Sequence, residues 1–203
     1  MKHWGLSLFI ALFLFASCSG TENQSSNAQD DTTGLTATQE AFWEEISQHC
    51  GKAYAGSFVG QPVPAGFEGQ EMKMYVMSCD ENVIKIPFYV GEDRSRTWVL
   101  TKTDKGILLK HDHRLEDGTP DEETMYGGHT SHGGAENVQF FPADQETVDM
   151  IPGAAANLWW ITIDKSQYSY NLRRVTGPNI FSVVFDLENP IEVPELPWGH
   201  EVE

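Results

Sequence analysis

Basic side chains are scarce in this 203-residue chain, which has 13 lysines and arginines against 30 aspartates and glutamates. The formal net charge is therefore −17 at pH 7. A surface this acidic repels the phosphate backbone, so nucleic acid is not an expected partner. The charge is compatible with cation binding, although such a surplus is more commonly a solubility feature.

Motifs of several common enzyme classes are also missing. There is no Gly-x-Ser-x-Gly element that would present a serine nucleophile. The glycine pairs Gly127-Gly128 and Gly133-Gly134 lack the lysine and the following helix that a phosphate-binding loop needs. A pattern of alternating strands and helices is absent as well, which argues against a parallel α/β fold.

Cysteines number only three, and the first, Cys18, directly follows a predicted targeting segment. A short basic start, an apolar run from Leu6 to Phe15 and two small residues precede Cys18, which is typical of a signal peptide. The block Phe15-Ala16-Ser17-Cys18 resembles the lipobox of bacterial lipoproteins, with Phe15 where leucine is usual. The resemblance implies a signal peptide over 1–17, a lipid on Cys18 and an anchor in a bacterial envelope membrane. An ordinary cleaved signal with a chance cysteine is the alternative.

Cys50 and Cys79 are the other two cysteines. In an oxidising envelope compartment a lone pair usually bridges, so we expect a disulfide between them. Such a bridge would stabilise the fold by about 3–4 kcal/mol in the chain-entropy model. Two buried free thiols are the alternative, and neither cysteine lies in a reactive motif.

Composition divides the remainder into three parts. Residues 18–35 are polar and almost free of apolar side chains, which predicts a flexible tether. Residues 36–189 are enough for a single domain with a sizeable core. From Pro190 the tail is rich in proline, and we expect it to run extended over the surface.

The domain is predicted to be mainly β, with one N-terminal helix. Capping-box spacing at Thr36 and an apolar face that includes Phe42 and Ile46 predict a helix that ends at Cys50. Beyond Ala53 the apolar period changes to two, and tight turns separate about eight or nine short strands.

These strands predict an antiparallel β-barrel or a sandwich. A helix that leads into an up-and-down barrel is similar to the calycin (lipocalin-like) architecture. The likeness is one of architecture. Gly56-Ser57-Phe58 stands nearest to the Gly-x-Trp signature of that family, with phenylalanine in place of tryptophan.

Histidines are concentrated between residues 96 and 134, a stretch predicted to be a β-hairpin followed by a glycine-rich loop. Residues two apart share one face of a strand, so His111 and His113 are expected to point into the interior. The opposite face carries charged side chains that we expect to be solvated: Lys110, Asp112 and Arg114.

A divalent metal is one possible ligand of this stretch. Neutral imidazole is a common ligand for zinc, copper and iron, so His111 and His113 can chelate, with His129 and His132 completing the site. The spacing matches no specific zinc motif. His111-x-His113 followed by Glu116 is similar to the first cupin motif, with the glutamate too early. Partly buried, hydrogen-bonded histidines without metal are the alternative.

Aromatic side chains on the predicted strands give a second candidate site. An interior lined by Trp98 together with His111 and His113 would bind a small apolar or amphipathic molecule. Arg173 is unusual in so acidic a chain and would hold an anionic head group, with a surface ion pair as the alternative. A filled core is the alternative for the aromatic side chains.

The sequence thus predicts an envelope lipoprotein, periplasmic or surface-exposed, whose barrel binds a small molecule or partner protein and is not a catalyst. A metal-binding protein or metal-dependent enzyme that uses the histidine cluster is a second hypothesis. A structural envelope protein with a filled core is the third. An internal cavity favours the first hypothesis, and convergence of three histidine nitrogens on one point favours the second.

Overall fold

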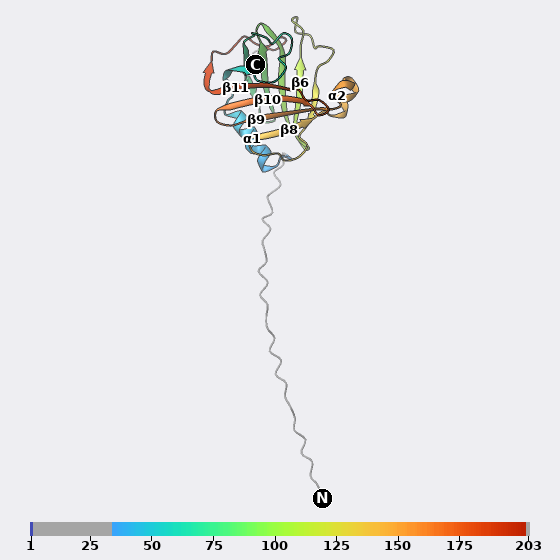
Figure 1. Ribbon diagram of the computed structural model, residues 1–203. Helices are drawn as coiled ribbons and strands as arrows, with labels where there is room; N and C mark the ends of the chain where they lie inside the picture. The colour runs from blue at the N-terminus through green and yellow to red at the C-terminus, as the bar shows by residue number, and fades with distance from the viewer. Residues whose placement is uncertain (2–33, 202–203) are drawn as a thin grey trace. The chain divides into compact units, whose positions relative to one another are not determined.

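The computed structural model describes Met1 and residues 34–201 (Figure 1). Beyond Met1, the predicted signal peptide over 1–17 lies outside the described residues, as do Cys18 and most of the predicted tether over 18–35. Leu35, at the end of that tether, packs against the hydrophobic core. The packed chain therefore begins one residue ahead of the predicted helix cap.

Residues 34–201 form eleven strands and three helices, which confirms a mainly β protein with an N-terminal helix. The helices are α1 (Ala37–Ser47), α2 (Gln145–Met150) and the short 3-10 helix η1 (Pro152–Ala154). The strands are β1 (Ala53–Phe58), β2 (Met72–Tyr75), β3 (Ser78–Cys79), β4 (Val83–Val90), β5 (Asp93–Thr103), β6 (Gly106–His113), β7 (Tyr126–His129), β8 (Val138–Pro142), β9 (Asn157–Ile163), β10 (Gln167–Arg174) and β11 (Ile180–Ile191). No helix in this described part has the length and apolar character of a membrane span.

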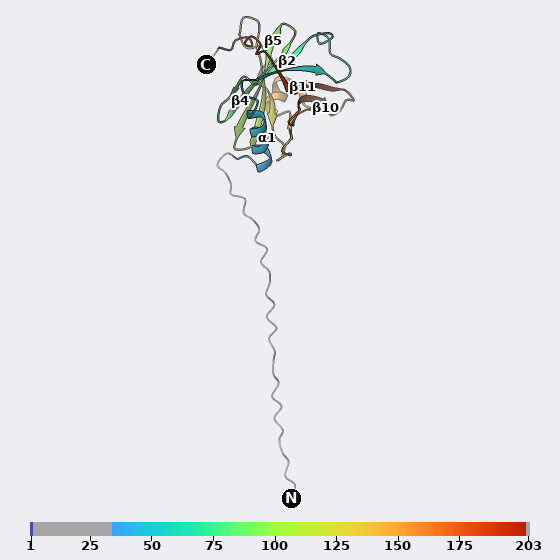
Figure 2. The same cartoon turned by 90° about the vertical axis from the view of Figure 1, so that its left-hand side faces the viewer.

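The strands belong to one antiparallel sheet that curls into a nearly closed barrel (Figures 1 and 2). The order is β7-β6-β5-β4-β2-β1-β11-β10-β9-β8, with β3 paired to β4. Successive strands are mostly neighbours, and β1 pairs with β11, so the path is up-and-down. Of the two predicted architectures, the barrel is correct.

The barrel closes between β7 and β8, where isolated backbone hydrogen bonds replace a ladder. The amide of Asp144 donates to the carbonyl oxygen of Gly127 over 2.9 Å. Gly128 allows the close approach, because a Cβ there would lie 1.9 Å from the carbonyl oxygen of Pro142. Part of the predicted glycine-rich loop is therefore a strand whose glycines let two backbones meet.

Helix α1 covers one end of the barrel (Figures 1 and 2). Thr36 forms the predicted capping box with Gln39. The helix ends at Ser47, earlier than the predicted end at Cys50, and a turn follows. Its apolar face is buried through three side chains: Phe42, Trp43 and Ile46.

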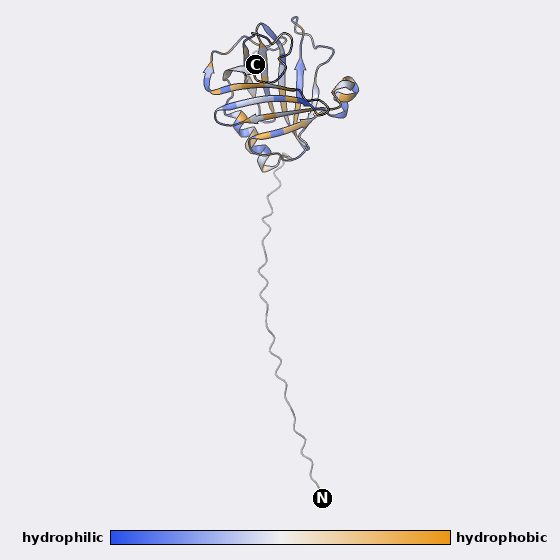
Figure 3. Ribbon diagram, in the orientation of Figure 1, coloured by the Kyte–Doolittle hydropathy of each residue, from blue (hydrophilic) through white to orange (hydrophobic). Residues whose placement is uncertain are grey.

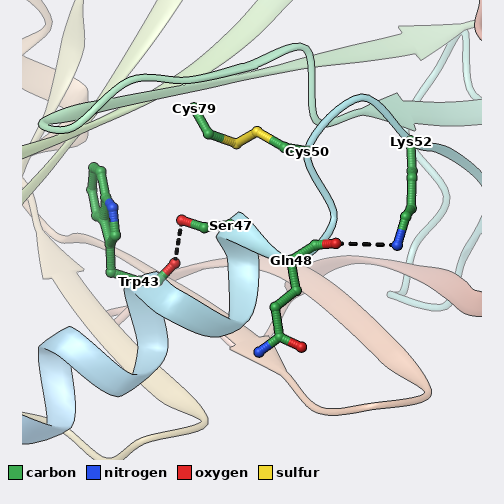
Figure 4. Close-up of a disulfide and its surroundings, with 6 residues drawn as sticks. All are labelled: Trp43, Ser47, Gln48, Cys50, Lys52 and Cys79. Carbon is green, nitrogen blue, oxygen red and sulfur yellow. Dashed lines mark hydrogen bonds between the residues drawn. A yellow bond between two sulfur atoms is a disulfide. The ribbon is translucent and has the colours of Figure 1, made fainter.

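A disulfide between Cys50 and Cys79 confirms the predicted pairing (Figure 4). The two Cα atoms lie 6.1 Å apart. Ser47 Oγ donates to the carbonyl oxygen of Trp43 over 2.8 Å at the end of α1. The bridge thus ties the turn after α1 to β3. Strands β1 and β2 lie between the two cysteines in the sequence.

Pro87 predicts an edge strand or a bulge from sequence alone. The structure makes β4 an interior strand, and its register with β5 shifts between Phe88 and Val90, directly after the proline. On one side β4 pairs with β3 through Lys85 and with β2 through Phe88. Pro87 lies in the gap between these two ladders, where no partner strand requires its missing N–H. The proline is accommodated by a change of partner.

The tail predicted from Pro190 begins inside β11, which ends at Ile191, and the described residues after β11 lie against strands β4 to β6. Tyr89 Oη donates to the carbonyl oxygen of Glu195 over 2.9 Å. The amide of Trp198 donates to the carbonyl oxygen of Arg94 over 3.2 Å. The tail therefore covers part of the outer face of the barrel.

The buried hydrophobic cluster draws side chains from α1 and from most of the strands. Hydrophobic positions, in orange, recur along the strands of the barrel (Figure 3). The inward residues of β6 nearest α1, Ile107 and Leu109, are aliphatic and fully buried. Farther along β6 the interior becomes aromatic and polar, beginning at His111. This change in chemistry marks the end of the barrel opposite α1 as the place for a site.

Candidate functional site

Strand β6 presents its two histidines to the interior, as its alternation predicts. His111 is 3% exposed, and both His111 and His113 line an internal cavity. The prediction for the opposite face is wrong, since Lys110 and Asp112 are each only 7% exposed.

Partners from distant segments make this burial possible. Lys110 Nζ lies 3.0 Å from Asp144 Oδ2 and 2.7 Å from Glu146 Oε2 of α2. Asp112 Oδ2 lies 3.1 Å from Arg114 Nε and 3.3 Å from Nε2 of His200 in the tail. Buried charges are tolerated when they are paired, so α2 and the tail cover the outer face of β6.

A cavity of about 150 Å³ lies at the end of the barrel opposite α1, and we call it the chamber. Leu172 and four polar residues, Arg96, Thr97, His111 and His113, form part of its lining. The rest of the lining consists of seven aromatic side chains: Phe67, Phe88, Trp98, Tyr126, Trp159, Tyr170 and Phe181. The chamber is therefore apolar, with a few polar groups in fixed places.

Stacked rings form one wall of the chamber. The centroid of the Trp98 ring lies 4.3 Å from that of Tyr170 and 5.0 Å from that of Phe88, in both cases nearly parallel. The His111 ring stacks on Tyr126 at 4.6 Å and approaches Trp159 at 5.1 Å. Offset contacts of this kind fix ring positions beyond what area burial provides.

His111 has both ring nitrogens engaged. Nδ1 lies 2.9 Å from the carbonyl oxygen of Tyr126, which can only accept, so Nδ1 carries the proton. Nε2 then accepts from the hydroxyl of Tyr170, 2.6 Å away. Burial lowers the pKa of His111 to about 3 and raises the pKa of Tyr170 well above its ordinary value. His111 is therefore neutral, with no lone pair left for a metal.

His113 and Tyr126 form the second polar pair. His113 Nε2 lies 3.1 Å from the hydroxyl of Tyr126. Burial, followed by the nearby charge of Arg96, lowers the pKa of His113. Burial is also the main cause that raises the pKa of Tyr126 to about 12. Both groups are accordingly uncharged near pH 7.

Arg96 is the one guanidinium in the chamber lining, and its charge is balanced. Its Nη1 lies 2.7 Å from Oδ2 of Asp93. Its guanidinium carbon lies 5.8 Å from the centroid of Phe67, within cation–π range. The Asp93–Arg96 pair therefore adds no net charge to the chamber.

A larger hollow of about 790 Å³, which we call the vestibule, shares four lining residues with the chamber: His113, Tyr126, Trp159 and Leu172. Its charged lining consists of Asp121, Glu122, Glu123 and Arg174. The amide of Asp121 donates to the carbonyl oxygen of His113 over 2.9 Å, which holds the acidic segment beside the chamber. The vestibule is thus an acidic hollow that shares part of its wall with the aromatic chamber.

The four histidines of the predicted metal site are not brought together. His129 pairs with Leu108 in the β6–β7 ladder and shares its face, opposite to that of His111. His132 is exposed, and its Nδ1 accepts from the amide of Gly134 over 3.0 Å. Across residues 34–201, no group of three or more histidine, cysteine or acidic side chains is arranged to hold a metal ion.

Three of the four predicted ligand-binding residues line the chamber, and the fourth does not. Trp98, His111 and His113 line the chamber, whereas Arg173 is exposed and its Nε donates to the carbonyl oxygen of Gly177 over 3.3 Å. The arginine that does line the chamber is Arg96. Sequence reasoning missed it, although it stands two residues before Trp98 and therefore shares its strand face.

Comparisons with protein-family models, with curated proteins and with solved structures find no match for this chain.

Proposed function

We propose that this chain is a lipid-anchored protein of a bacterial envelope whose barrel binds a small apolar or amphipathic molecule without transforming it. The observation that supports binding is the chamber, an aromatic cavity of about 150 Å³ beside the vestibule. That volume accommodates roughly one benzene-sized ring. The envelope location rests on the lipobox-like block that ends at Cys18.

The protonation states favour binding over catalysis. Both nitrogens of His111 are engaged in hydrogen bonds, and its pKa is far from the range in which a general base works. Tyr126 and Tyr170 hold their protons in the neutral range because burial raises their pKa values. These groups serve better as fixed hydrogen-bonding walls than as proton-transfer groups.

The test is a titration of the full-length chain with benzyl alcohol. Binding is measured by calorimetry and by tryptophan fluorescence. Trp98 and Trp159 line the chamber, so their emission should change when a ring enters. We expect saturable binding with one site per chain. An absence of saturable binding of both benzyl alcohol and indole would contradict the proposal.

A chamber-filling variant locates the bound ring. Leu172 lines both the chamber and the vestibule, so Leu172→Trp should reduce affinity at least about tenfold by occupying the entrance. Leu158→Trp is the matched control, because Leu158 lies on the neighbouring strand β9 outside the chamber lining. Equal loss of binding in both variants would mean that the ring binds elsewhere.

A further inference from the structure

We infer that the ligand of the chamber is a cation, namely a compact apolar or aromatic group that carries an ammonium. This inference rests on the proposed binding function and adds the charge of the ligand to it. The apolar group would occupy the chamber, and the ammonium would lie in the vestibule. Two features carry the assignment. The one charged residue of the chamber lining, Arg96, is paired with Asp93 outside the lining, and an acidic hollow shares part of the chamber wall.

The chamber suits only the uncharged end of such a ligand. Asp93 neutralises Arg96 at 2.7 Å. His111 is buried and carries one ring proton, because Nδ1 donates to the Tyr126 carbonyl oxygen while Nε2 accepts from the Tyr170 hydroxyl. An isolated charge placed among these aromatic rings would lose its hydration without gaining a counter-ion. A ligand group seated there should therefore be apolar, and the ligand's charge should remain in the vestibule.

The vestibule carries the charge that selects the other end. The vestibule lining includes one guanidinium, that of Arg174, and three carboxylates: Asp121, Glu122 and Glu123. The excess is negative, and the chain as a whole adds to it with a net charge of −17. A hollow lined by one sign of charge concentrates ligands of the opposite sign.

The acidic segment is close enough to act on a ligand that spans both spaces. The amide of Asp121 donates to the carbonyl oxygen of His113 over 2.9 Å. Asp121 and Glu123 line the vestibule together with Tyr126, which also lines the chamber. An ammonium held by a short linker to a ring in the chamber would therefore lie beside these carboxylates.

Exposure limits the size of the effect. Glu122, Glu123 and Arg174 are exposed, so salt and water screen their interaction with a ligand. Each exposed pair contributes little, and we expect the cationic probe to bind only about 3–10-fold more tightly than a neutral probe. The preference should shrink to less than about twofold in 0.5 M salt, because the Debye length is then short.

The experiment uses three probes that share one ring, namely benzylammonium, benzyl alcohol and benzoate, with the full-length chain at low salt and pH 7. The expected order of affinity is benzylammonium, then benzyl alcohol, then benzoate. Equal affinity for all three, or tightest binding of benzoate, would overturn the inference while leaving the proposed function standing. Failure of all three probes to bind would overturn the proposed function itself.

A charge-matched pair of variants assigns the preference to the vestibule. Glu122→Gln/Glu123→Gln should lower affinity for benzylammonium about 3–10-fold and leave affinity for benzyl alcohol unchanged, which also reports an intact chamber. Glu44→Gln/Glu188→Gln removes two exposed carboxylates outside the vestibule lining. Equal effects of the two double variants would assign the preference to net charge alone and contradict the vestibule as its source.

Discussion

His111 shows how a single side chain can be locked in one protonation state. Its Nδ1 donates to a backbone carbonyl, and its Nε2 accepts from Tyr170 over 2.6 Å. A proton on Nε2 would make that nitrogen a donor, so the Tyr170 hydroxyl would have to rotate and accept, and it would place a charge in an apolar interior. The residue therefore fixes the rings of Tyr126 and Tyr170 at the chamber wall instead of exchanging protons.

This protonation state makes stability depend on pH in a specific window. The pKa of His111 is about 3 in the folded chain, whereas an unfolded histidine titrates near 6.5. Between these values the unfolded chain binds the additional proton, so the free energy of unfolding falls as pH falls below 6.5. The loss from this one group is about 1.4 kcal/mol for each pH unit within the window.

Denaturant unfolding at pH 7, 6 and 5 tests this dependence. His111→Phe should be less stable than the parent at pH 7, because it leaves the Tyr170 hydroxyl without its acceptor. It should also lose less stability between pH 7 and pH 5 than the parent does. His129→Phe is the control for replacing an imidazole by a phenyl ring, since His129 is half-buried on the outer face, away from the chamber. Parallel slopes for the parent and His111→Phe would refute the assignment.

At the scale of elements, the barrel depends on how closely β7 approaches β8. Gly128→Ala would bring a Cβ to 1.9 Å from the carbonyl oxygen of Pro142, so the seam must open. We expect a loss of about 1–3 kcal/mol in the free energy of unfolding. Gly153→Ala is the matched control, because a Cβ there meets nothing within 4 Å. Unfolding curves in urea check this, and Gly128→Ala with parental stability would contradict a tight seam.

The same elements mark how far sequence reasoning reaches. Alternation along β6 correctly places His111 and His113 inside, because the inward or outward choice follows from local periodicity. Alternation along β6 could not predict the burial of Lys110 and Asp112. Their burial depends on α2 and on the C-terminal tail, which reach β6 only through the tertiary fold.

The candidate site also contains features that local sequence patterns could not predict. A metal site over four histidines assumes that β7 turns His129 inward, and only the register of the β6–β7 ladder reveals the opposite. Phe67 could not be assigned to the chamber either, because it lies in the long β1–β2 connection. The mainly β class and the disulfide depend on composition, period and compartment, so they could be predicted.

At the scale of the whole molecule, the two ends of the barrel differ, and the net charge favours ligands of one sign. The end of the barrel at α1 is closed by apolar packing that includes Phe42, Trp43 and Ile46, and the other end holds the chamber. A negative excess across the chain favours the approach of cations from a distance, on a scale set by the Debye length. Tethering such a domain to a membrane would keep it where exported or imported small molecules pass.

The last prediction concerns the lipid anchor, whose predicted attachment site is Cys18. A single modified cysteine with more than one acyl chain anchors stably, because each buried CH₂ contributes about 0.8 kcal/mol. We expect the chain to fractionate with membranes and its N-terminal peptide to carry the mass of acyl groups on Cys18. Cys18→Ala should move the protein to the soluble fraction while benzyl alcohol binding is retained. Membrane association that survives this substitution, or an unmodified Cys18 in membrane extracts, would contradict the lipoprotein assignment and leave the chamber unaffected.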